Sequence, residues 1–281
     1  MSKIKFETSV RFKGLPKIIY RNYDSNVDGK AFMENQFSHW VIDDYHRHSN
    51  KYHEDNYSEW EDLILDDQLP ITPKESAYCL NVIDSIVEWY DSESSEVCIF
   101  ADDCVDFSVS DHWMFDWEFL THHLPYNWDC IQFYASPNRS IKMHLHPWID
   151  QNKSQRCCMV TRSFAKRLKK FHLIDGKYKL SYPSPNRSLL FTEFGSLDSF
   201  FYDLGITYTL PIFALNTKGE FSHTEKISSD AIRYWWENKS PVFSNFEFFH
   251  YNKGDKEWKM EVQFDSDGVY MDPMEGIMIW I

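Results

Sequence analysis

The alternation of helix-like segments with short apolar runs most constrains what this chain can fold into. Apolar residues recur at helical spacing in some segments and form continuous runs in the segments between them. Helices are expected over 31–45, 73–90, 113–124, 162–171, 196–204 and 229–236, and strands over 17–20, 97–101, 129–134, 141–146, 156–160 and 206–213. Helices that alternate with apolar strands predict an α/β layered domain.

Three further segments refine this expectation. Thr72-Pro73-Lys74-Glu75 combines a capping box with proline at the first helical position, so a helix is expected to begin there. The polar stretch 43–67 fits either a surface helix or a mobile loop. Apolar side chains alternate over 258–264 as in a half-buried strand. We therefore expect one domain over 1–243 and a β-rich C-terminal extension over 244–281 that packs on it.

The charge and the cysteine pattern exclude several classes of protein. The chain of 281 residues carries 29 Lys and Arg against 43 Asp and Glu, a formal net charge of -14, which disfavours nucleic acid as a partner. No apolar run reaches the roughly 18 residues that span a bilayer, and residues 1–6 lack the apolar stretch of a secretory signal. The six cysteines show no CxxC spacing and indicate free thiols. A cytoplasmic location without a transmembrane segment is expected.

The strongest chemical signal is the acidic segment Phe100-Ala101-Asp102-Asp103-Cys104-Val105-Asp106, which follows an apolar strand. Ligands of open α/β sheets bind outside the carboxyl ends of the strands. Two carboxylates about 4 Å apart repel by about 4 kcal/mol at an effective dielectric constant near 20, so such a group favours a bound cation. Oxygen ligands favour Mg²⁺ or Mn²⁺. The alternative is that Asp102, Asp103 and Asp106 cap turns and face water.

Four motifs in order give a family resemblance. They are the capping box at 72–75, the segment Cys98-Ile99-Phe100-Ala101-Asp102-Asp103-Cys104-Val105, the segment Leu124-Pro125-Tyr126-Asn127-Trp128-Asp129-Cys130-Ile131-Gln132, and the segment Cys157-Cys158-Met159-Val160-Thr161-Arg162-Ser163-Phe164-Ala165-Lys166-Arg167-Leu168. Together they resemble glycosyltransferase family 25, the lipopolysaccharide and collagen galactosyltransferase type. The stretch from Leu197-Asp198 to Leu210-Pro211 resembles a later part of that family more loosely. The family's glutamate corresponds to Ala101 here, which puts the metal ligands in question.

The resemblance implies a GT-A-like (Rossmann-like) mixed sheet flanked by helices. It also implies transfer of a hexose such as galactose from a nucleotide-sugar donor, most simply a UDP-sugar, to a glycan or other hydroxyl acceptor. Asp103, with Asp102 or Asp106, would hold a divalent Mn²⁺ or Mg²⁺ ion that bridges the donor diphosphate.

Three more residues are candidates for roles at this site, the first of them from the resemblance. Asp198 matches the position of a catalytic base or another acceptor-side contact, or is simply an acid in the first turn of a helix. His223 could reach the metal or the diphosphate from a second loop, or be a loop histidine without a role. Arg162 opens a basic helix that either faces solvent or, with Asp102, contacts the donor phosphates.

Two other functions remain open. Ala101 is compatible with a non-catalytic carbohydrate-binding protein of the same fold. His144 and His146 lie on one side of an expected strand, as in non-haem iron or cupin-like enzymes, although no third ligand is apparent. His46-Arg47-His48 is expected on the surface.

Overall fold

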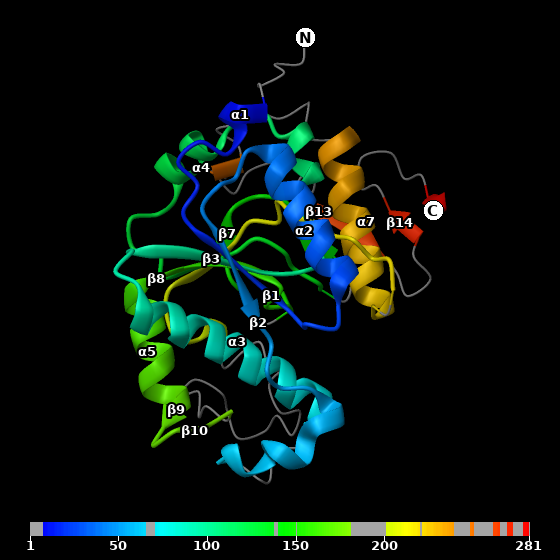
Figure 1. Cartoon of the computed structure of the whole chain (residues 1–281). Helices are drawn as coiled ribbons and strands as arrows, with labels where there is room; N and C mark the ends of the chain where they lie inside the picture. The colour runs from blue at the N-terminus through cyan, green and yellow to red at the C-terminus, as the bar shows by residue number, and fades with distance from the viewer. Residues whose placement is uncertain are drawn as a thin grey trace.

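A seven-stranded mixed sheet forms the centre of the molecule (Figure 1), with the strand order β2-β1-β3-β8-β5-β11-β7. The structure, a computed structural model, describes residues 8–65, 71–137, 140–149, 151–180, 201–219, 221–238, 248–249, 261–264, 269–271 and 278–280. The strands of this sheet are β1 (Ile18–Asn22), β2 (Tyr45–Ser49), β3 (Val97–Asp102), β5 (Cys130–Gln132), β7 (His146–Pro147), β8 (Cys157–Thr161) and β11 (Thr207–Thr209). β8 runs antiparallel to both of its neighbours, whereas β2, β1 and β3 are mutually parallel, as are β5 and β11.

Helices cover both faces of this sheet (Figure 1). One face packs on α2 (Val27–Trp40), α4 (Trp117–His123) and α7 (His223–Asn238), and the other on α3 (Pro73–Ser92) and α5 (Arg162–His172). Alternate residues of β3 enter the two cores: Ile99 and Ala101 join the first, and Cys98 and Phe100 join the second. Because both faces are buried, β3 has the continuous apolar sequence of a central strand. The expected α/β class, a Rossmann-like mixed sheet flanked by helices, is confirmed.

The start of α3 is also confirmed. Thr72 Oγ1 accepts a hydrogen bond from the Glu75 backbone N–H at 3.2 Å, and the Glu75 carboxylate accepts one from the Thr72 N–H at 2.8 Å. Both bonds satisfy amide groups that have no partner inside the helix. The helix continues to Ser92, and its buried apolar side chains join the second core.

Several expectations for local structure are wrong. The expected strand 141–146 is divided between β6 (Ser140–Lys142) and β7, which belong to different sheets, and the expected helix 31–45 ends at Trp40. The segment 113–124 is not one helix, because a 3-10 helix η3 (Ser108–His112) precedes an extended stretch and α4 begins only after the N-cap Asp116. Trp113 is nevertheless buried, and its indole N–H donates to the carbonyl of Ile212 at 3.2 Å. The polar stretch 43–67 is neither a long helix nor a loop, since it contains β2 and the 3-10 helices η1 (Glu54–Glu59) and η2 (Glu61–Leu63).

The C-terminal part is rich in strands, as expected. β13 (Glu261–Phe264), β14 (Val269–Met271) and β15 (Met278–Trp280) form an antiparallel sheet with β6 (Ser140–Lys142) from the middle of the chain. The boundary between residues 243 and 244 stays a prediction. Shorter elements are α1 (Thr8–Arg11), β4 (Val105–Asp106), β9 (Leu173–Ile174), β10 (Lys177–Tyr178) and β12 (Ala214–Leu215). In the described ranges, no helix combines the length and the apolar character needed to cross a membrane.

Candidate functional site

The carboxyl ends of β1 and β3 form the topological switch point of the sheet. The two strands are parallel neighbours, and the chain continues from β1 through α2 to β2 on one side, whereas β8 and β5 lie on the other side of β3. In open α/β sheets the crevice outside such a point is where ligands bind. The residues expected at a ligand site are therefore Asn22, at the end of β1, and the acids at and after the end of β3.

Asp103 lies at this switch point. Its Oδ2 accepts hydrogen bonds from Asn22 Nδ2 at 2.6 Å and from Asn26 Nδ2 at 2.8 Å. Asn26 is also the N-cap of α2, where its Oδ1 accepts from the backbone N–H of Gly29 at 3.1 Å. Burial raises the pKa of Asp103, and the two amide groups offset only part of that rise. Among the described residues, no hydrogen bond reaches Asp103 Oδ1.

Gly29 allows the first turn of α2 to approach Asp103 closely. A Cβ atom at position 29 would lie 2.5 Å from Asn26 Nδ2 and 2.7 Å from Asp103 Oδ2, both shorter than van der Waals contact. The glycine thus leaves room for a carboxylate at the amino end of the helix, where the helix dipole favours negative charge.

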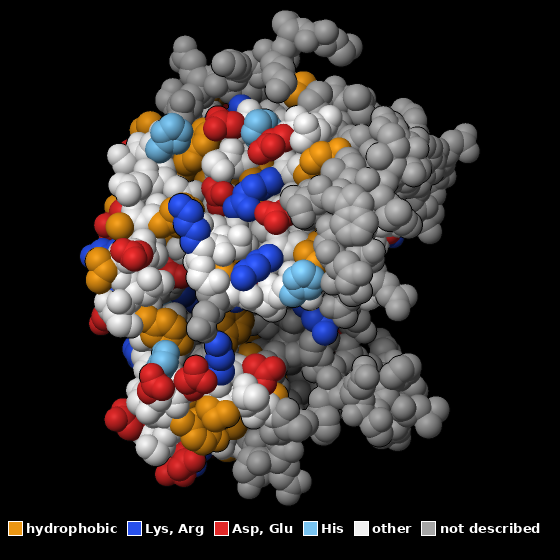
Figure 2. Space-filling view, turned by 90° about the vertical axis from the view of Figure 1, so that its right-hand side faces the viewer, with side chains coloured by type: hydrophobic (Ala, Val, Ile, Leu, Met, Phe, Trp, Pro, Cys, Tyr) orange, Lys and Arg blue, Asp and Glu red, His pale blue; other side chains and the backbone are white. Residues whose placement is uncertain are grey.

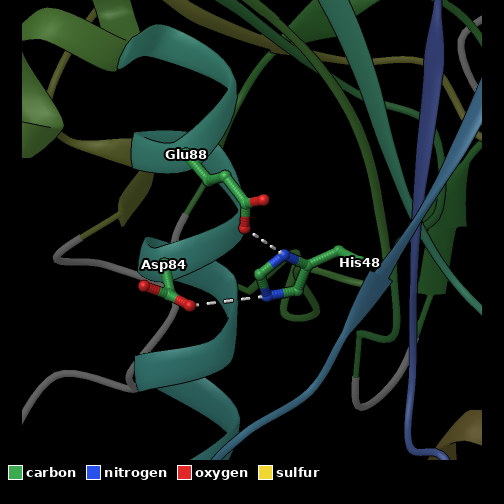
Figure 3. A group of neighbouring side chains, drawn as sticks. All are labelled: His48, Asp84 and Glu88. Carbon is green, nitrogen blue, oxygen red and sulfur yellow. Dashed lines mark ion pairs between the residues drawn. The ribbon is translucent and has the colours of Figure 1, made fainter. Parts of the chain in front are cut away.

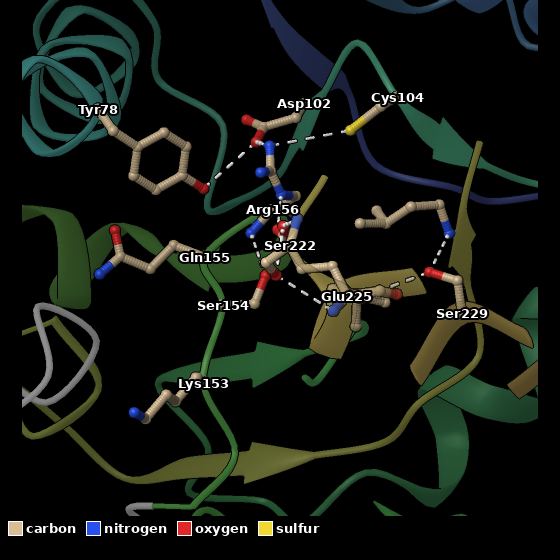
Figure 4. A network of polar contacts seen from close by, with 12 residues as sticks. Tyr78, Asp102, Cys104, Lys153, Ser154, Gln155, Arg156, Ser222, Glu225 and Ser229 are labelled. Atoms are coloured by element: carbon tan, nitrogen blue, oxygen red, sulfur yellow. Dashed lines mark hydrogen bonds and ion pairs between the residues drawn. The ribbon is translucent and has the colours of Figure 1, made fainter. Parts of the chain in front are cut away.

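Asp102 contacts two arginines. Its Oδ1 accepts a hydrogen bond from Arg21 Nε at 2.8 Å, and Arg21 Nη2 donates to the carbonyl of Gln155 at 2.7 Å. Its Oδ2 accepts from Arg156 Nη1 at 3.0 Å and from the Tyr78 hydroxyl at 3.3 Å (Figure 4). The Arg21 side chain is 1% exposed and that of Asp102 is 8% exposed. Burial alone would lower the pKa of Arg21, but Asp102, Tyr78 and Cys158 together offset burial and the pKa is raised. Asp102 therefore holds two guanidinium groups in place.

Arg156 continues this network towards α7. Its Nε donates to Glu225 Oε1 at 2.7 Å, and Glu225 Oε2 accepts from the Ser222 hydroxyl at 2.9 Å. Burial would raise the pKa of Glu225, but Arg156 and Ser222 lower it overall. Because β8 is antiparallel to β3, Arg156, which precedes β8, lies at the carboxyl edge beside Asp102. Two carboxylates here balance two guanidinium groups.

Asp106 has a different partner. Its Oδ2 pairs with Arg233 Nη2 of α7 at 2.9 Å, and its Oδ1 accepts from the Ser108 N–H at 2.9 Å. His223 is exposed at the start of α7. Where side chains are described, ligand atoms of three His, Cys, Asp or Glu residues come close together at His48, Asp84 and Glu88 rather than in the segment 102–106 (Figure 3). The structure does not gather Asp102, Asp103, Asp106 and His223 into one metal site.

Arg162 lies at the other end of β3 from Asp102. It follows Thr161, which pairs with Val97 at the beginning of β3. Its guanidinium donates to the carbonyls of Glu93 at 2.6 Å and Tyr90 at 2.8 Å, and so caps the last turn of α3. The structure thus does not bring Arg162 to the donor site expected around Asp102. Asp198 lies outside the described residues.

His144 and His146 are buried. Burial lowers the pKa of His144 to about 3 and that of His146 to about 4. Both ring nitrogens of His146 have partners, because Nδ1 lies 2.7 Å from the carbonyl of His144 and Nε2 lies 2.9 Å from Asn152 Nδ2. In the described part of the chain, neither histidine belongs to a group of three close metal ligands.

A cleft of about 670 Å³ lies between α2, η3 and α7. Carboxylates, cationic groups, side-chain amides and aromatic rings line it: Phe32, Asn35, Gln36, His39, Trp40, Asp106, Ser108, Asp111, Asn216, Thr217, Lys218 and Arg233. Figure 2 shows the molecule from the α7 side, where Lys and Arg are interspersed with Asp and Glu on the described surface. The cleft adjoins the switch point, since the N–H of Asn216 donates to the carbonyl of Cys104, next to Asp103.

Sequence reasoning missed the two arginines of the network. Arg21 directly follows the apolar run Ile18-Ile19-Tyr20 within β1, which has a neighbouring strand on each side. A charged residue buried in such a strand requires a counter-ion. The charged residue after an apolar run was visible in the sequence. Arg156 gave no comparable signal, because its position at the carboxyl edge follows only from the antiparallel direction of β8.

Comparison with known proteins yields a distant structural similarity. No protein-family model matches the sequence, and no curated protein matches it. Among solved structures, the chain is similar to A197 from STIV, with a TM-score of 0.37 and 10% sequence identity over 71% of this chain and 84% of that chain. A similarity of this size carries no argument about activity.

Proposed function

We propose that this chain is a glycosyltransferase that moves a hexose from a nucleotide-sugar donor, a UDP-sugar, to a hydroxyl of a glycan acceptor. The observation that carries the proposal is the meeting of Asp103, Asn22 and Asn26 at the switch point of the sheet. This carboxylate belongs to the segment that resembles glycosyltransferase family 25, and the crevice is where α/β sheets bind nucleotides.

Dependence on Mn²⁺ or Mg²⁺ is part of the proposal, with Asp103 as the protein ligand. Such ions often bind through one or two carboxylates and take further oxygens from substrate phosphates. Asp103 fits this role, because the described residues leave its Oδ1 without a hydrogen bond. Asp102 and Asp106 fit less well, since both are paired with arginines. When bound, the ion would act as a Lewis acid for the leaving nucleoside diphosphate.

The cleft beside the switch point is the proposed acceptor site. Its side-chain amides and carboxylates suit the hydroxyl groups of a sugar, and Phe32 and Trp40 offer apolar ring surface. Asp198 remains the proposed general base that takes the proton of the acceptor hydroxyl. In this proposal, Asp102 positions Arg21 and Arg156 and contacts no substrate.

The test is thermal denaturation with Mn²⁺ and a panel of nucleotide-sugars, followed by assays of donor hydrolysis. UDP or a UDP-sugar should raise the melting temperature only when Mn²⁺ is present, and Asp103→Asn should abolish that rise. Asp62→Asn, which changes an exposed acid in η2, is the matched control and should respond like the unsubstituted protein. If no nucleotide shifts the melting curve, or if Asp103→Asn behaves like the control, the proposal fails.

A non-catalytic carbohydrate-binding protein is the second candidate. It is favoured by the pairing of Asp102 and Asp106 with arginines, which leaves one carboxylate for a metal ion. The two candidates differ in their response to glycans. A pure binding protein would be stabilised by oligosaccharides without any nucleotide and would hydrolyse no donor, and substitution of Asp111 in the cleft would weaken that stabilisation.

A further inference from the structure

His48 of β2 faces two carboxylates of α3 (Figure 3). Its Nδ1 lies 2.9 Å from Glu88 Oε2, and its Nε2 lies 3.6 Å from Asp84 Oδ2. The His48 side chain is 3% exposed, whereas Glu88 is 50% exposed and Asp84 17%. The expectation that His46-Arg47-His48 lies on the surface is therefore wrong for His48, whose ring is buried against α3, whereas His46 is exposed.

The two ring nitrogens have different environments. The short contact at Nδ1 fits an N–H that donates to Glu88, and this tautomer leaves a lone pair on Nε2. Nε2 is buried and accepts no hydrogen bond from any described residue, since its 3.6 Å separation from Asp84 Oδ2 is too long for one. The lone pair therefore faces an oxygen of Asp84, and two electron-rich atoms that face each other in a buried place favour a cation between them.

We propose that His48 and Asp84 bind a Zn²⁺ ion, with Glu88 fixing the orientation of the imidazole. Two ligands held about 2.0 Å from a tetrahedral zinc ion are about 3.3 Å apart, close to the separation of Nε2 and Asp84 Oδ2. A histidine that binds zinc through one nitrogen commonly donates its other N–H to a carboxylate, as His48 does to Glu88. The mixed nitrogen and oxygen set favours zinc over Mg²⁺, and water completes the coordination.

Burial lowers the pKa of His48, although Asp84 and Glu88 act in the opposite direction and Lys51 adds to the lowering.

Lys51 competes with the ion. Its ammonium lies 2.8 Å from Asp84 Oδ2, the same oxygen that faces His48. The Lys51 side chain is 59% exposed, so it can turn into solvent when a divalent ion arrives. Asp84 remains held by the Tyr178 hydroxyl, which donates to its Oδ1 at 3.3 Å. Removal of the Lys51 charge should therefore tighten zinc binding without disturbing the ligands.

The experiment is calorimetric titration of the metal-stripped full chain with ZnCl₂, together with thermal denaturation and no nucleotide. We expect one zinc ion per chain and a raised melting temperature. Asp84→Asn should weaken binding by about tenfold or more, since the loss of a supporting residue alone weakens zinc sites by about 10- to 100-fold. Lys51→Met should strengthen it. Asp91→Asn, which removes another lysine-paired acid from the same helix, is the matched control.

Three results of the titrations would overturn the proposal. These are no zinc binding in molar excess, equal affinity in Asp84→Asn and Asp91→Asn, or an affinity that Lys51→Met leaves unchanged. The Lys51 variant keeps the test valid if Asp84→Asn fails to fold. A cobalt-loaded sample with thiolate charge-transfer absorption would assign the ion to a cysteine and would also refute the site. Because nucleotide is absent, the outcome does not depend on the proposed glycosyltransferase activity.

Discussion

At the scale of single residues, Asp102 has the largest electrostatic role in the described site. It neutralises Arg21, which is almost wholly buried, and contacts Arg156 with its second oxygen. Removing one partner of a buried ion pair leaves an uncompensated charge, which usually costs about 3–5 kcal/mol. We expect Asp102→Asn to lower the free energy of unfolding by about that amount, measured by urea denaturation.

Asp103→Asn is the matched comparison for this prediction. Asp103 accepts hydrogen bonds from two neutral amides and neutralises no buried arginine. Its substitution should therefore lower the free energy of unfolding by less than about 1.5 kcal/mol, the usual worth of a hydrogen bond. Equal losses in the two variants would mean that charge pairing is not what makes Asp102 important.

Single residues of the site were predicted from the sequence only in part. The acids at 102–106 were identified because they directly follow an apolar strand. Their partners were not, since Arg21 and Arg156 are separated from Asp102 by 81 and 54 residues. Long-range pairing depends on which strands are neighbours, and the order of strands in a sheet is not written in local sequence patterns.

At the scale of secondary-structure elements, the capping box of α3 gives a direct prediction. Thr72→Ala removes the hydroxyl that accepts from the Glu75 N–H. The loss of such an N-cap usually costs about 1 kcal/mol. We expect that decrease in the free energy of unfolding, and Thr72→Ser should restore most of it. Lys74→Ala, in the same exposed turn but outside the box, should have little effect; a similar loss there would contradict the capping argument.

The first turn of α2 gives a second prediction. Alanine normally stabilises a helix by about 1 kcal/mol relative to glycine. At position 29 the new Cβ would lie 2.7 Å from Asp103 Oδ2, so Gly29→Ala should show no gain in urea denaturation. Because Asp103 must shift, the variant should also weaken Mn²⁺-dependent nucleotide stabilisation. Lys30→Ala, at the neighbouring position, is the control. If Gly29→Ala instead raised the free energy of unfolding by the full amount of about 1 kcal/mol, the close approach to Asp103 would be refuted.

Elements with strong local signals were predicted well, and polar or irregular ones were not. α3 has a capping box, and β3 and β8 are apolar because both faces of the sheet are covered. β2 is polar because it lies at the edge of the sheet, and its sequence resembles a loop. The spacing of Trp113 relative to Trp117 fits the helix that follows, but Trp113 lies in an extended segment and is nevertheless buried. Apolar spacing therefore predicted the burial of this residue correctly and its backbone conformation wrongly.

At the scale of the whole molecule, two buried histidines predict how stability changes with pH. The pKa of His144 is lowered from 6.5 to about 3 and that of His146 to about 4, first of all by burial. Between these values and 6.5 the unfolded chain binds protons that the folded chain does not. The stabilisation is therefore complete above pH 6.5 and is lost as the pH falls, by at most about 1.4 kcal/mol per pH unit for each histidine.

Urea denaturation from about pH 7.5 down to about pH 5 measures this effect. The slope of the unfolding free energy against pH is proportional to the number of protons taken up on unfolding. Replacement of both histidines with asparagine should reduce that number by nearly two. A slope that is the same in the double variant would mean that other groups control the acid sensitivity.

The position of β8 also has a consequence for synthesis of the chain. β8 lies between β3 and β5, although β5 comes earlier in the sequence. β3 can pair with β1, which precedes it, but until residue 161 has left the ribosome its other edge, which later pairs with β8, has no partner strand and is strongly apolar. A nascent chain stalled between β5 and β8 would therefore expose a surface that chaperones recognise or that aggregates, and it would become protected only when β8 closes the gap.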